Sequence, residues 1–366
     1  MCGCVSGSKP TQKYPVILIR QIVVPELSSI TALPKEAVDA VSVTVVVPVY
    51  GGELTLTEAL CSILAQNLSG IEVIVLDDGS TDASFRIAKE IEDDRLIVLQ
   101  HANRGLAATL NRGSSLAKGR YVARQDQDDL VLAGRLEKQF AFLEAHPDVA
   151  MVGTWAQIYS GNIPTQRYHR HPCSSEALKL ELLFDNPFVH SSMMIRTDVL
   201  RDVGGYCEDK SRQPPEDYEL WSRVARQHPV ANLPEVLTVY REMPGSMSRT
   251  GENPFLKNVI RIASENLSHV LSPRYSLEEC VALADVYHRG GTGKALASIS
   301  RAQARQMLES AARKIGGNKS GWTEEFLVSY SRMRAHIDSR FLQRIIPTPL
   351  RAPMRWLRNR LFRRES

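Results

Sequence analysis

The feature that most constrains the fold of this chain is a nearly continuous run of β-branched residues, Val41–Val47. Such a run is typical of a strand that is buried on both faces of a parallel sheet. A second run, Ile71–Leu76, follows it, and shorter apolar runs lie at Leu96–Leu99 and Tyr121–Ala123. The segments between them have helical periodicity: Glu53–Asn67, a segment that ends near Glu92, and Gly105–Ala117. This alternation predicts an α/β fold, with a mostly parallel sheet and helices on both faces.

Beyond the first four predicted strands, the chain is predicted to form a mixture of helices and strands and then helices alone. We first expect mixed elements: helix Ala133–Ala145, strand Val149–Ile158, helix Ser175–Phe184, strand Phe188–Ile195, helix Thr197–Val203, helix Glu216–Gln227, and a loop and strand at Leu233–Arg241. Beyond Asn253 we expect helices alone: Pro254–Leu271, Ser276–Tyr287, Lys294–Lys314, Thr323–Ile346 and an amphipathic piece, Leu350–Phe362. The predicted divisions are therefore an extension (1–40), the main α/β domain (41–250), a helical region (251–346) and a basic tail (347–366).

Length and composition set broad limits. The chain has 366 residues and no apolar run of the roughly 18–20 residues that a membrane span needs. The first residues, Met1-Cys2-Gly3-Cys4, lack the features of a secretory signal. The six cysteines are scattered, which favours a reducing compartment over a disulfide framework: Cys2, Cys4, Cys61, Cys173, Cys207 and Cys280. We expect a cytoplasmic protein with no nucleic-acid partner.

The positive charge is concentrated at the C-terminal end. From Arg332 onwards there are ten arginines and two acidic residues, whereas the whole chain has a net charge of only +4. Leu350–Phe362 mixes these arginines with apolar residues that include Trp356. A basic amphipathic helix of this kind suits the anionic inner face of a membrane, although a helix packed on the main domain is an alternative. A peripheral membrane contact would suit a lipid-linked partner.

Acidic residues follow two of the predicted strands. Asp77-Asp78 follows Ile71–Leu76, and three carboxylates, Asp126, Asp128 and Asp129, follow Tyr121–Ala123. Ligands of open α/β sheets bind at the carboxyl ends of the strands. Clustered carboxylates raise one another's pKa unless a cation lies among them, and Mg²⁺ or Mn²⁺ prefers such oxygen ligands. The alternative is a polar loop in which aspartate caps the following helix.

Glu216-Asp217 opens a helix further along the chain. The two acids either match the helix dipole or provide a general base near a positive site. Other common sites are absent from the sequence. The first strand is not followed by G-x-G-x-x-G, and there is no H-E-x-x-H and no pair of C-x-x-C motifs. These absences argue against a dinucleotide-dependent dehydrogenase and the usual zinc sites.

Six motifs in order carry a family resemblance. They are Val43-Thr44-Val45-Val46-Val47-Pro48-Val49-Tyr50, Asp77-Asp78-Gly79-Ser80-Thr81-Asp82, Asn103-Arg104-Gly105-Leu106, Ala123-Arg124-Gln125-Asp126-Gln127-Asp128-Asp129, Gly204-Gly205-Tyr206 and Glu216-Asp217-Tyr218-Glu219-Leu220-Trp221. From about Val41 to Arg241 the chain resembles the family 2 glycosyltransferases, which have the Rossmann-like GT-A fold. The resemblance implies metal-dependent, inverting transfer of a sugar from a nucleotide diphosphosugar, with UDP-sugars favoured. The acceptor is a saccharide or a lipid-linked saccharide, and cell-surface polysaccharide or glycolipid synthesis is the expected setting.

The resemblance also implies roles for particular residues. Asp217 is the catalytic base, Asp128 is a metal ligand, and Asp126 lies near the metal and the ribose or sugar. The residues expected at the nucleotide, donor or acceptor are Pro48, Tyr50, Glu53, Asp77, Asp78, Arg104, Arg124, Glu216 and His190.

Two positions depart from the family pattern. Gly51 stands where many relatives have Asn, and Met243 stands where many have a His near the end of the domain. If that His helps to hold the metal or diphosphate, this chain must use Glu242, Arg241 or water instead. A degenerate member that binds nucleotide sugar or a partner without turnover is therefore an open alternative. A nucleotidyltransferase is a second one, but the loop after the first strand lacks the Lys and Gly signature that it needs.

Overall fold

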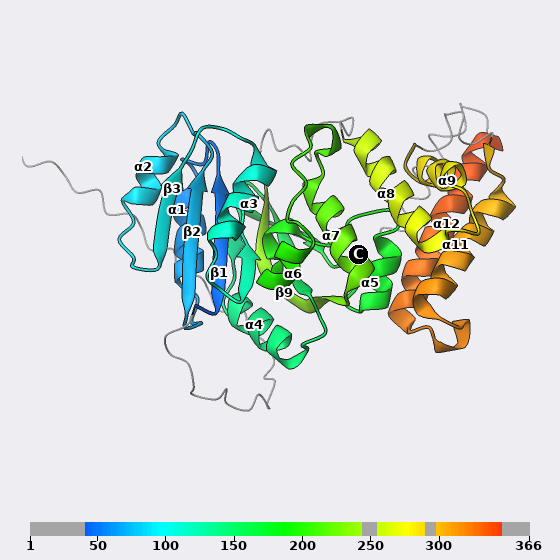
Figure 1. Ribbon diagram of the computed structural model, residues 1–366, viewed down its shortest axis with the longest axis horizontal. Helices are drawn as coiled ribbons and strands as arrows, with labels where there is room; N and C mark the ends of the chain where they lie inside the picture. Colours follow the sequence, from blue (N-terminus) through cyan, green and yellow to red (C-terminus); the bar gives the residue numbers. More distant parts are fainter. Residues whose placement is uncertain (1–40, 244–254, 290–297, 346–366) are drawn as a thin grey trace, which may run out of the picture. The chain divides into compact units, whose positions relative to one another are not determined.

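The strands form one sheet in the computed structural model, which describes residues 41–243, 255–289 and 298–345. The strands are β1 (Val43–Val49), β2 (Ile71–Asp77), β3 (Leu96–Gln100), β4 (Tyr121–Arg124), β5 (Leu130–Val131), β6 (Met151–Ser160), β7 (Ile163–His169), β8 (Met194–Arg196) and β9 (Val230–Glu242). Their order is β3-β2-β1-β4-β8-β6-β9-β5, and β7 pairs with β6. Figure 1 shows β3, β2 and β1 side by side at one end of this order. The extension at 1–40, the predicted boundary near 245–253 and the basic tail lie outside the described residues.

The N-terminal half of the sheet confirms the predicted parallel strands. β3, β2, β1 and β4 are all parallel neighbours, and the register places Val49 beside Asp77 and Val46 beside Arg124. The strand β1 is buried at every position because helices cover both faces of the sheet. Val46 packs in a cluster with α3 (Leu106–Leu116) and α7 (Glu216–Gln227). Val45 and Val47 pack on the other face with α1 (Leu56–Leu64) and α4 (Arg135–Ala145).

The C-terminal half of the sheet is mixed. β8 is antiparallel to β4 and to β6, whereas β9 is parallel to β6. The sequence did not predict β7 or β5. β7 has no fully buried position, so it lacks an alternating apolar pattern, and β5 has only two residues.

The expectation of a strand over Phe188–Ile195 was wrong in its first half. A short 3₁₀ helix, η1 (His190–Ser192), replaces it, and β8 begins only at Met194. Ser192 Oγ donates to the carbonyl of Val189 at 2.8 Å, so the serine side chain supports the turn. Competition of this kind with ladder hydrogen bonds is a common property of serine.

The short helices complete the main domain. They are α2 (Ser84–Lys89), α5 (Ser175–Glu181), α6 (Thr197–Asp202) and the 3₁₀ segment η2 (Lys210–Arg212). Of these, α2, α5 and α6 agree with the predicted positions to within a few residues. The helix α5 is shared between two cores, because Leu178 packs in the α3–α7 cluster whereas Leu180 packs with the C-terminal helices.

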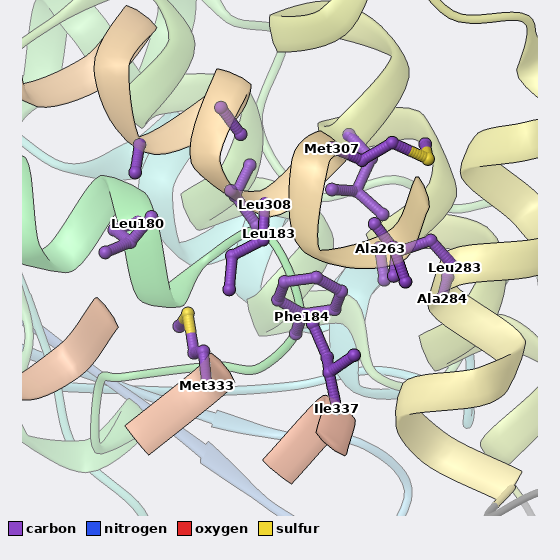
Figure 2. Packing of buried hydrophobic residues seen from close by; sticks show 14 of the residues in the cluster. Leu180, Leu183, Phe184, Ala263, Leu283, Ala284, Met307, Leu308, Met333 and Ile337 are labelled. Atoms are coloured by element: carbon purple, nitrogen blue, oxygen red, sulfur yellow. The ribbon is translucent and has the colours of Figure 1, made fainter. Parts of the chain in front are cut away.

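The C-terminal helices pack around an apolar core of their own. Those described are α8 (Leu256–Leu271), α9 (Leu277–Arg289), α11 (Arg301–Gly316), the 3₁₀ segment η4 (Lys319–Gly321) and α12 (Glu324–Ile345). Figure 2 shows Leu180, Leu183 and Phe184 of the main domain beside Met333 and Ile337 of α12. The buried Glu181 accepts hydrogen bonds from Ser329 and Arg332 of the same helix. No helix in the described ranges is long and apolar enough to cross a membrane.

Candidate active site

The acidic loop leaves the sheet at the end of β4. Gln125 N donates to the carbonyl of Val46 at 3.2 Å, so the loop begins beside the end of β1. One carboxylate oxygen from each of Asp126, Asp128 and Asp129 lies within 4.8 Å of the others. Asp126 and Asp128 are partly exposed, whereas Asp129 is 1% exposed. The structure thus brings together the two residues predicted as metal ligands and also Asp129, which was expected in the carboxylate cluster but not named as a ligand.

Two groups from the protein stabilise this triad. The guanidinium of Arg124 pairs with Asp126. Ser191 Oγ lies between Asp126, to which it donates at 2.8 Å, and Asp129, which it also contacts. Ser191 follows the predicted acceptor-side residue His190 directly, and this adjacency was the only signal in the sequence for its role.

The triad holds more negative charge than its surroundings neutralise. Burial raises the pKa of Asp128 to about 6, and the charge of Asp126 adds to this effect. Burial also raises the pKa of Asp129 well above its ordinary value, with contributions from Asp126 and Asp128. A divalent cation would relieve this repulsion, because carboxylate oxygens are the ligands that Mg²⁺ and Mn²⁺ accept. The residues present therefore fit such an ion.

Arg241, at the end of β9, connects the acidic loop to α1. Its backbone N–H donates to Asp129 Oδ1 at 2.7 Å. Its buried guanidinium donates to Glu58 of α1 at 2.5 Å and to the carbonyl of Asp128 at 3.3 Å. Glu242, the other residue considered as a substitute for the missing His, bonds Arg167 at 3.0 Å. In this arrangement Arg241 supports the loop, while the Glu242 carboxylate is engaged by a cation on β7.

The loop after β1 is fastened to the acidic loop. The side-chain amide of Gln127 accepts from Tyr50 N at 2.8 Å and donates to Tyr50 O at 3.0 Å. Tyr50 is 59% exposed, so its side chain is accessible from solvent next to the acidic loop. Gly51 has φ of 67°, a left-handed conformation in which glycine and asparagine are favoured. The departure from Asn at this position is thus compatible with the loop.

Pro48 and Glu53 have structural partners near the same loop. Pro48 is buried within β1. Glu53 exchanges hydrogen bonds with the start of α2, because its N–H donates to Asp82 at 3.1 Å and its carboxylate accepts from Ala83 N at 3.1 Å. The contacts of Glu53 therefore hold the first and second loops together.

The two aspartates after β2 have different environments. Asp77 is 1% exposed; its Oδ2 accepts from Ser80 N at 3.1 Å and Gln100 Nε2 at 2.8 Å. Its Oδ1 is buried and has no hydrogen-bond partner among the described residues. Asp78 instead accepts from the backbone N–H of Arg104 at 2.7 Å and of Gly105 at 2.9 Å. Asp78 therefore fixes the start of α3, and the Arg104 side chain is exposed.

A second pair of acids lies at the start of α7. Burial raises the pKa of Glu216 to about 7, with a further contribution from the charge of Asp217. Burial also raises the pKa of Asp217. Asn186 Nδ2 donates to Asp217 Oδ2 at 2.8 Å, and Asp217 Oδ1 accepts from Tyr218 N at 2.7 Å. No local sequence pattern indicated Asn186, which is 31 residues away from Asp217.

His190 lies in an aromatic environment to which α7 contributes Trp221. Its Nε2 is 2.9 Å from the hydroxyl of Tyr206, and its ring packs edge-on against Trp221. Burial lowers the pKa of His190 well below its ordinary value, and the charge of Arg124 lowers it further. His190 is therefore neutral at physiological pH, which suits a hydrogen-bonding role.

Arg124 connects the two acidic groups. Burial raises the pKa of Asp128, of Glu216 and of Asp217, and the positive charge of Arg124 partly opposes this rise. The charge of Asp126 also contributes to raising the pKa of Glu216 and of Asp217. The acidic triad and the α7 pair, which come from separate elements, thus both lie within electrostatic range of one guanidinium. Asp77 ends the strand beside β1 on the same edge of the sheet.

Comparisons with known proteins agree on one family. The model described as Glycosyl transferase family 2 matches residues 44–204. EpsE of Bacillus subtilis, which is named provisionally as a glycosyltransferase, is 35% identical over 60% of this chain and 80% of its own length. The amylovoran biosynthesis glycosyltransferase AmsE of Erwinia amylovora is 30% identical over 60% of this chain and 83% of its own. S. aureus TarS, solved with UDP-GlcNAc, shares the fold with a TM-score of 0.54 and 18% identity, covering 82% of this chain and 89% of that structure.

Proposed function

Because the chain belongs to glycosyltransferase family 2 and is a transferase enzyme with the GT-A fold, we propose that it transfers a sugar with inversion from a nucleotide diphosphosugar to a hydroxyl group. The observation that carries this proposal is that two acidic groups from separate elements, the triad and Glu216-Asp217, both interact electrostatically with Arg124, which pairs directly with Asp126. A reaction that expels a diphosphate and activates an alcohol needs one such group at each end.

Asp77 supports a uridine nucleotide as the donor. Its Oδ1 is a buried acceptor without a described partner, and such an atom is costly to leave unpaired. The imide N–H of uracil is a donor of the right kind. Because the atom is closed off from solvent, we expect the turn at Ser80 to shift when the base binds. The UDP-GlcNAc in the TarS structure belongs to a protein of the same fold and agrees with this choice.

Asp126 and Asp128 would hold the metal ion in this proposal, as Mn²⁺ or Mg²⁺. When bound, such an ion neutralises the charge that develops on the diphosphate leaving group. The chain itself contributes Arg124, whose guanidinium pairs with Asp126 of the triad and whose charge also acts on Asp217. Tyr50 and Gln127 fix the loop over which the nucleotide would lie.

Asp217 would remove the proton from the acceptor hydroxyl. Burial moves the pKa of Asp217 towards neutral pH, and a general base is most effective when its pKa lies near the pH at which it works. Asn186 orients one oxygen by its hydrogen bond, and the neutral His190 is available to an acceptor hydroxyl nearby. A single displacement with one base on the side away from the leaving group inverts the anomeric centre.

The acceptor is proposed from the relatives. AmsE is named for amylovoran biosynthesis, and WbnJ of Escherichia coli, 31% identical over 79% of its length, is named for O-antigen biosynthesis. We propose a saccharide or lipid-linked saccharide acceptor in cell-surface polysaccharide or glycolipid synthesis. Contact of the basic tail with the inner face of the cytoplasmic membrane, and the division of the chain near residue 250, remain part of this proposal.

A catalytically inactive nucleotide-sugar binder is the second candidate. Met243 in place of the usual His favours it, because the side chain at this position cannot act as an imidazole ligand. A panel of nucleotide diphosphosugars tested by thermal shift with and without Mn²⁺ identifies the donor for either candidate. Release of free sugar or transfer to an acceptor then separates them, since the inactive binder gives a shift without turnover.

A further inference from the structure

A cavity of about 270 Å³ lies away from the acidic groups, where the main domain meets the C-terminal helices. Four helical segments line it: α5 with the residues that follow it, α7, α8 and α11. Its apolar lining consists of Leu182, Leu183, Ala225, Val270 and Ile315. The proposed sugar-transfer site uses none of these residues.

The ionisable side chains that line the cavity are all basic. Lys179, Arg226, His269 and Lys314 line it, and no acidic side chain does so among the described residues. The acids that act on Arg226 from outside have other partners, because Glu219 pairs with Arg223 and Glu265 pairs with Arg212.

Burial disfavours the charged forms of three of these basic groups. Burial lowers the pKa of Lys179, which Glu176 alone opposes, and burial also lowers the pKa of Arg226. For His269, burial is the first cause of its lowered pKa, and the charges of Arg226 and Lys314 are the others. Positive charges held close together without a counterion are unfavourable unless an anion joins them.

The polar wall of the cavity is ordered by its own hydrogen bonds. Arg226 Nη2 donates to Asn266 Oδ1 at 2.7 Å. Asn266 Nδ2 in turn donates to Leu182 O at 2.6 Å and to Ser222 Oγ at 2.8 Å. Arg226 Nε is buried and has no partner among the described residues. The guanidinium is thus held in place at the cavity wall, where its positive charge favours recognition of an anionic group.

We propose that this cavity binds a small organic anion, with a phosphate or carboxylate head at Lys179, Arg226 and Lys314 and a short apolar body on the leucine and isoleucine lining. Its volume lies near the lower end of the range for small-molecule sites, which fits a ligand of about ten non-hydrogen atoms. The head group belongs either to a free organic phosphate or to a membrane lipid. The inference does not depend on the proposed transferase chemistry.

The test uses the full chain with hexyl phosphate as the probe. Inorganic phosphate and hexanol, which represent the charged half and the apolar half of the probe, are the control ligands. Titration calorimetry at low salt should give saturable binding of hexyl phosphate with a Kd at or below about 1 mM. Each half should bind at least about tenfold more weakly. The double variant Lys179→Gln with Lys314→Gln should weaken hexyl phosphate binding by at least about tenfold. Lys257→Gln, which removes one exposed charge elsewhere on α8, is the matched control and should leave it unchanged.

Several outcomes overturn the inference: no saturable binding, equal binding by the wild type and the double variant, or equal binding of inorganic phosphate and hexyl phosphate. Circular dichroism melting of all variants establishes that they are folded. Vesicles with and without phosphatidic acid distinguish the sources. Co-sedimentation that the double variant loses identifies a lipid head group, whereas hexyl phosphate binding without co-sedimentation identifies a free organic phosphate.

Discussion

Asn186 Nδ2 donates a hydrogen bond of 2.8 Å to Oδ2 of Asp217, and this bond joins the loop after α5 to the first turn of α7. A hydrogen bond to the charged form of a carboxylate lowers its pKa, whereas burial raises it. We predict that Asn186→Ala raises the apparent pKa on the acidic side of the kcat profile, because the ionised base loses this bond. At neutral pH kcat should fall by about tenfold or more, which full pH–rate profiles will measure.

A structural defect alone would lower kcat at every pH. Recovery of the wild-type rate at high pH therefore distinguishes positioning from misfolding. If Asn186→Ala keeps the wild-type profile, the bond has no role in the reaction.

Asp128→Ala should abolish the metal dependence of donor binding. The triad would lose one of its two partly exposed carboxylates, so too few ligands remain for a hard divalent ion. Calorimetry with UDP in the presence and absence of Mn²⁺ measures the effect. Asp148→Ala, which removes an exposed carboxylate elsewhere, is the control. Unchanged Mn²⁺-dependent affinity in Asp128→Ala would count against the assigned role.

Glu216 should make the metal-free protein less stable as the pH rises. Its folded-state pKa is raised from 4.5 to about 7, so its stabilising contribution is complete below its unfolded pKa and is lost as pH rises through about 7. Glu216→Gln cannot ionise and avoids this loss. Its Tm should exceed that of the wild type by about 2–4 °C or more near pH 8 and match it near pH 5. A difference in the opposite direction near pH 8, measured by calorimetry, would refute the assignment.

The basic tail should mediate membrane contact without contributing to turnover. Removing the residues after Ile346 leaves α12, which extends to Ile345, intact. This truncation should lose co-sedimentation with anionic vesicles and keep donor hydrolysis at the wild-type rate, because the proposed site lies in β4, its loop and α7. Equal sedimentation of both forms would reject the membrane role, while lost hydrolysis would show that the tail supports the catalytic domain.

The parts of the fold that the sequence predicted are those in which local pattern and tertiary burial agree. Val43–Val49 and Ile71–Asp77 are buried on both faces, so their composition alone marks them as central strands. β7 and η1 could not be predicted in this way. β7 is an exposed hairpin strand whose pairing with β6 determines its conformation, and η1 depends on serine hydrogen bonds within a turn.

The residues of the candidate site show the same difference between local and long-range information. Asp126, Asp128 and Asp217 lie in short motifs, so the sequence could suggest them as functional residues. The groups that position them are distant in the chain: Ser191 contacts Asp126 across 65 residues, and Arg241 bonds Glu58 across 183. No local pattern specifies such pairs, because the sheet topology brings them together. The hydrogen bonds that Asp78 accepts from the backbone of Arg104 and Gly105 could likewise not be predicted from the sequence.

The most direct test is hydrolysis and transfer of UDP-sugars by the wild type and Asp217→Asn, each with Mn²⁺ and with chelator, alongside calorimetry of UDP binding. The wild type should turn over at least one UDP-sugar only with metal. Asp217→Asn should bind UDP with unchanged affinity and lose about 10²–10⁴-fold in kcat. Equal turnover by both proteins, or tight UDP binding with no turnover of any donor by the wild type, would contradict the account.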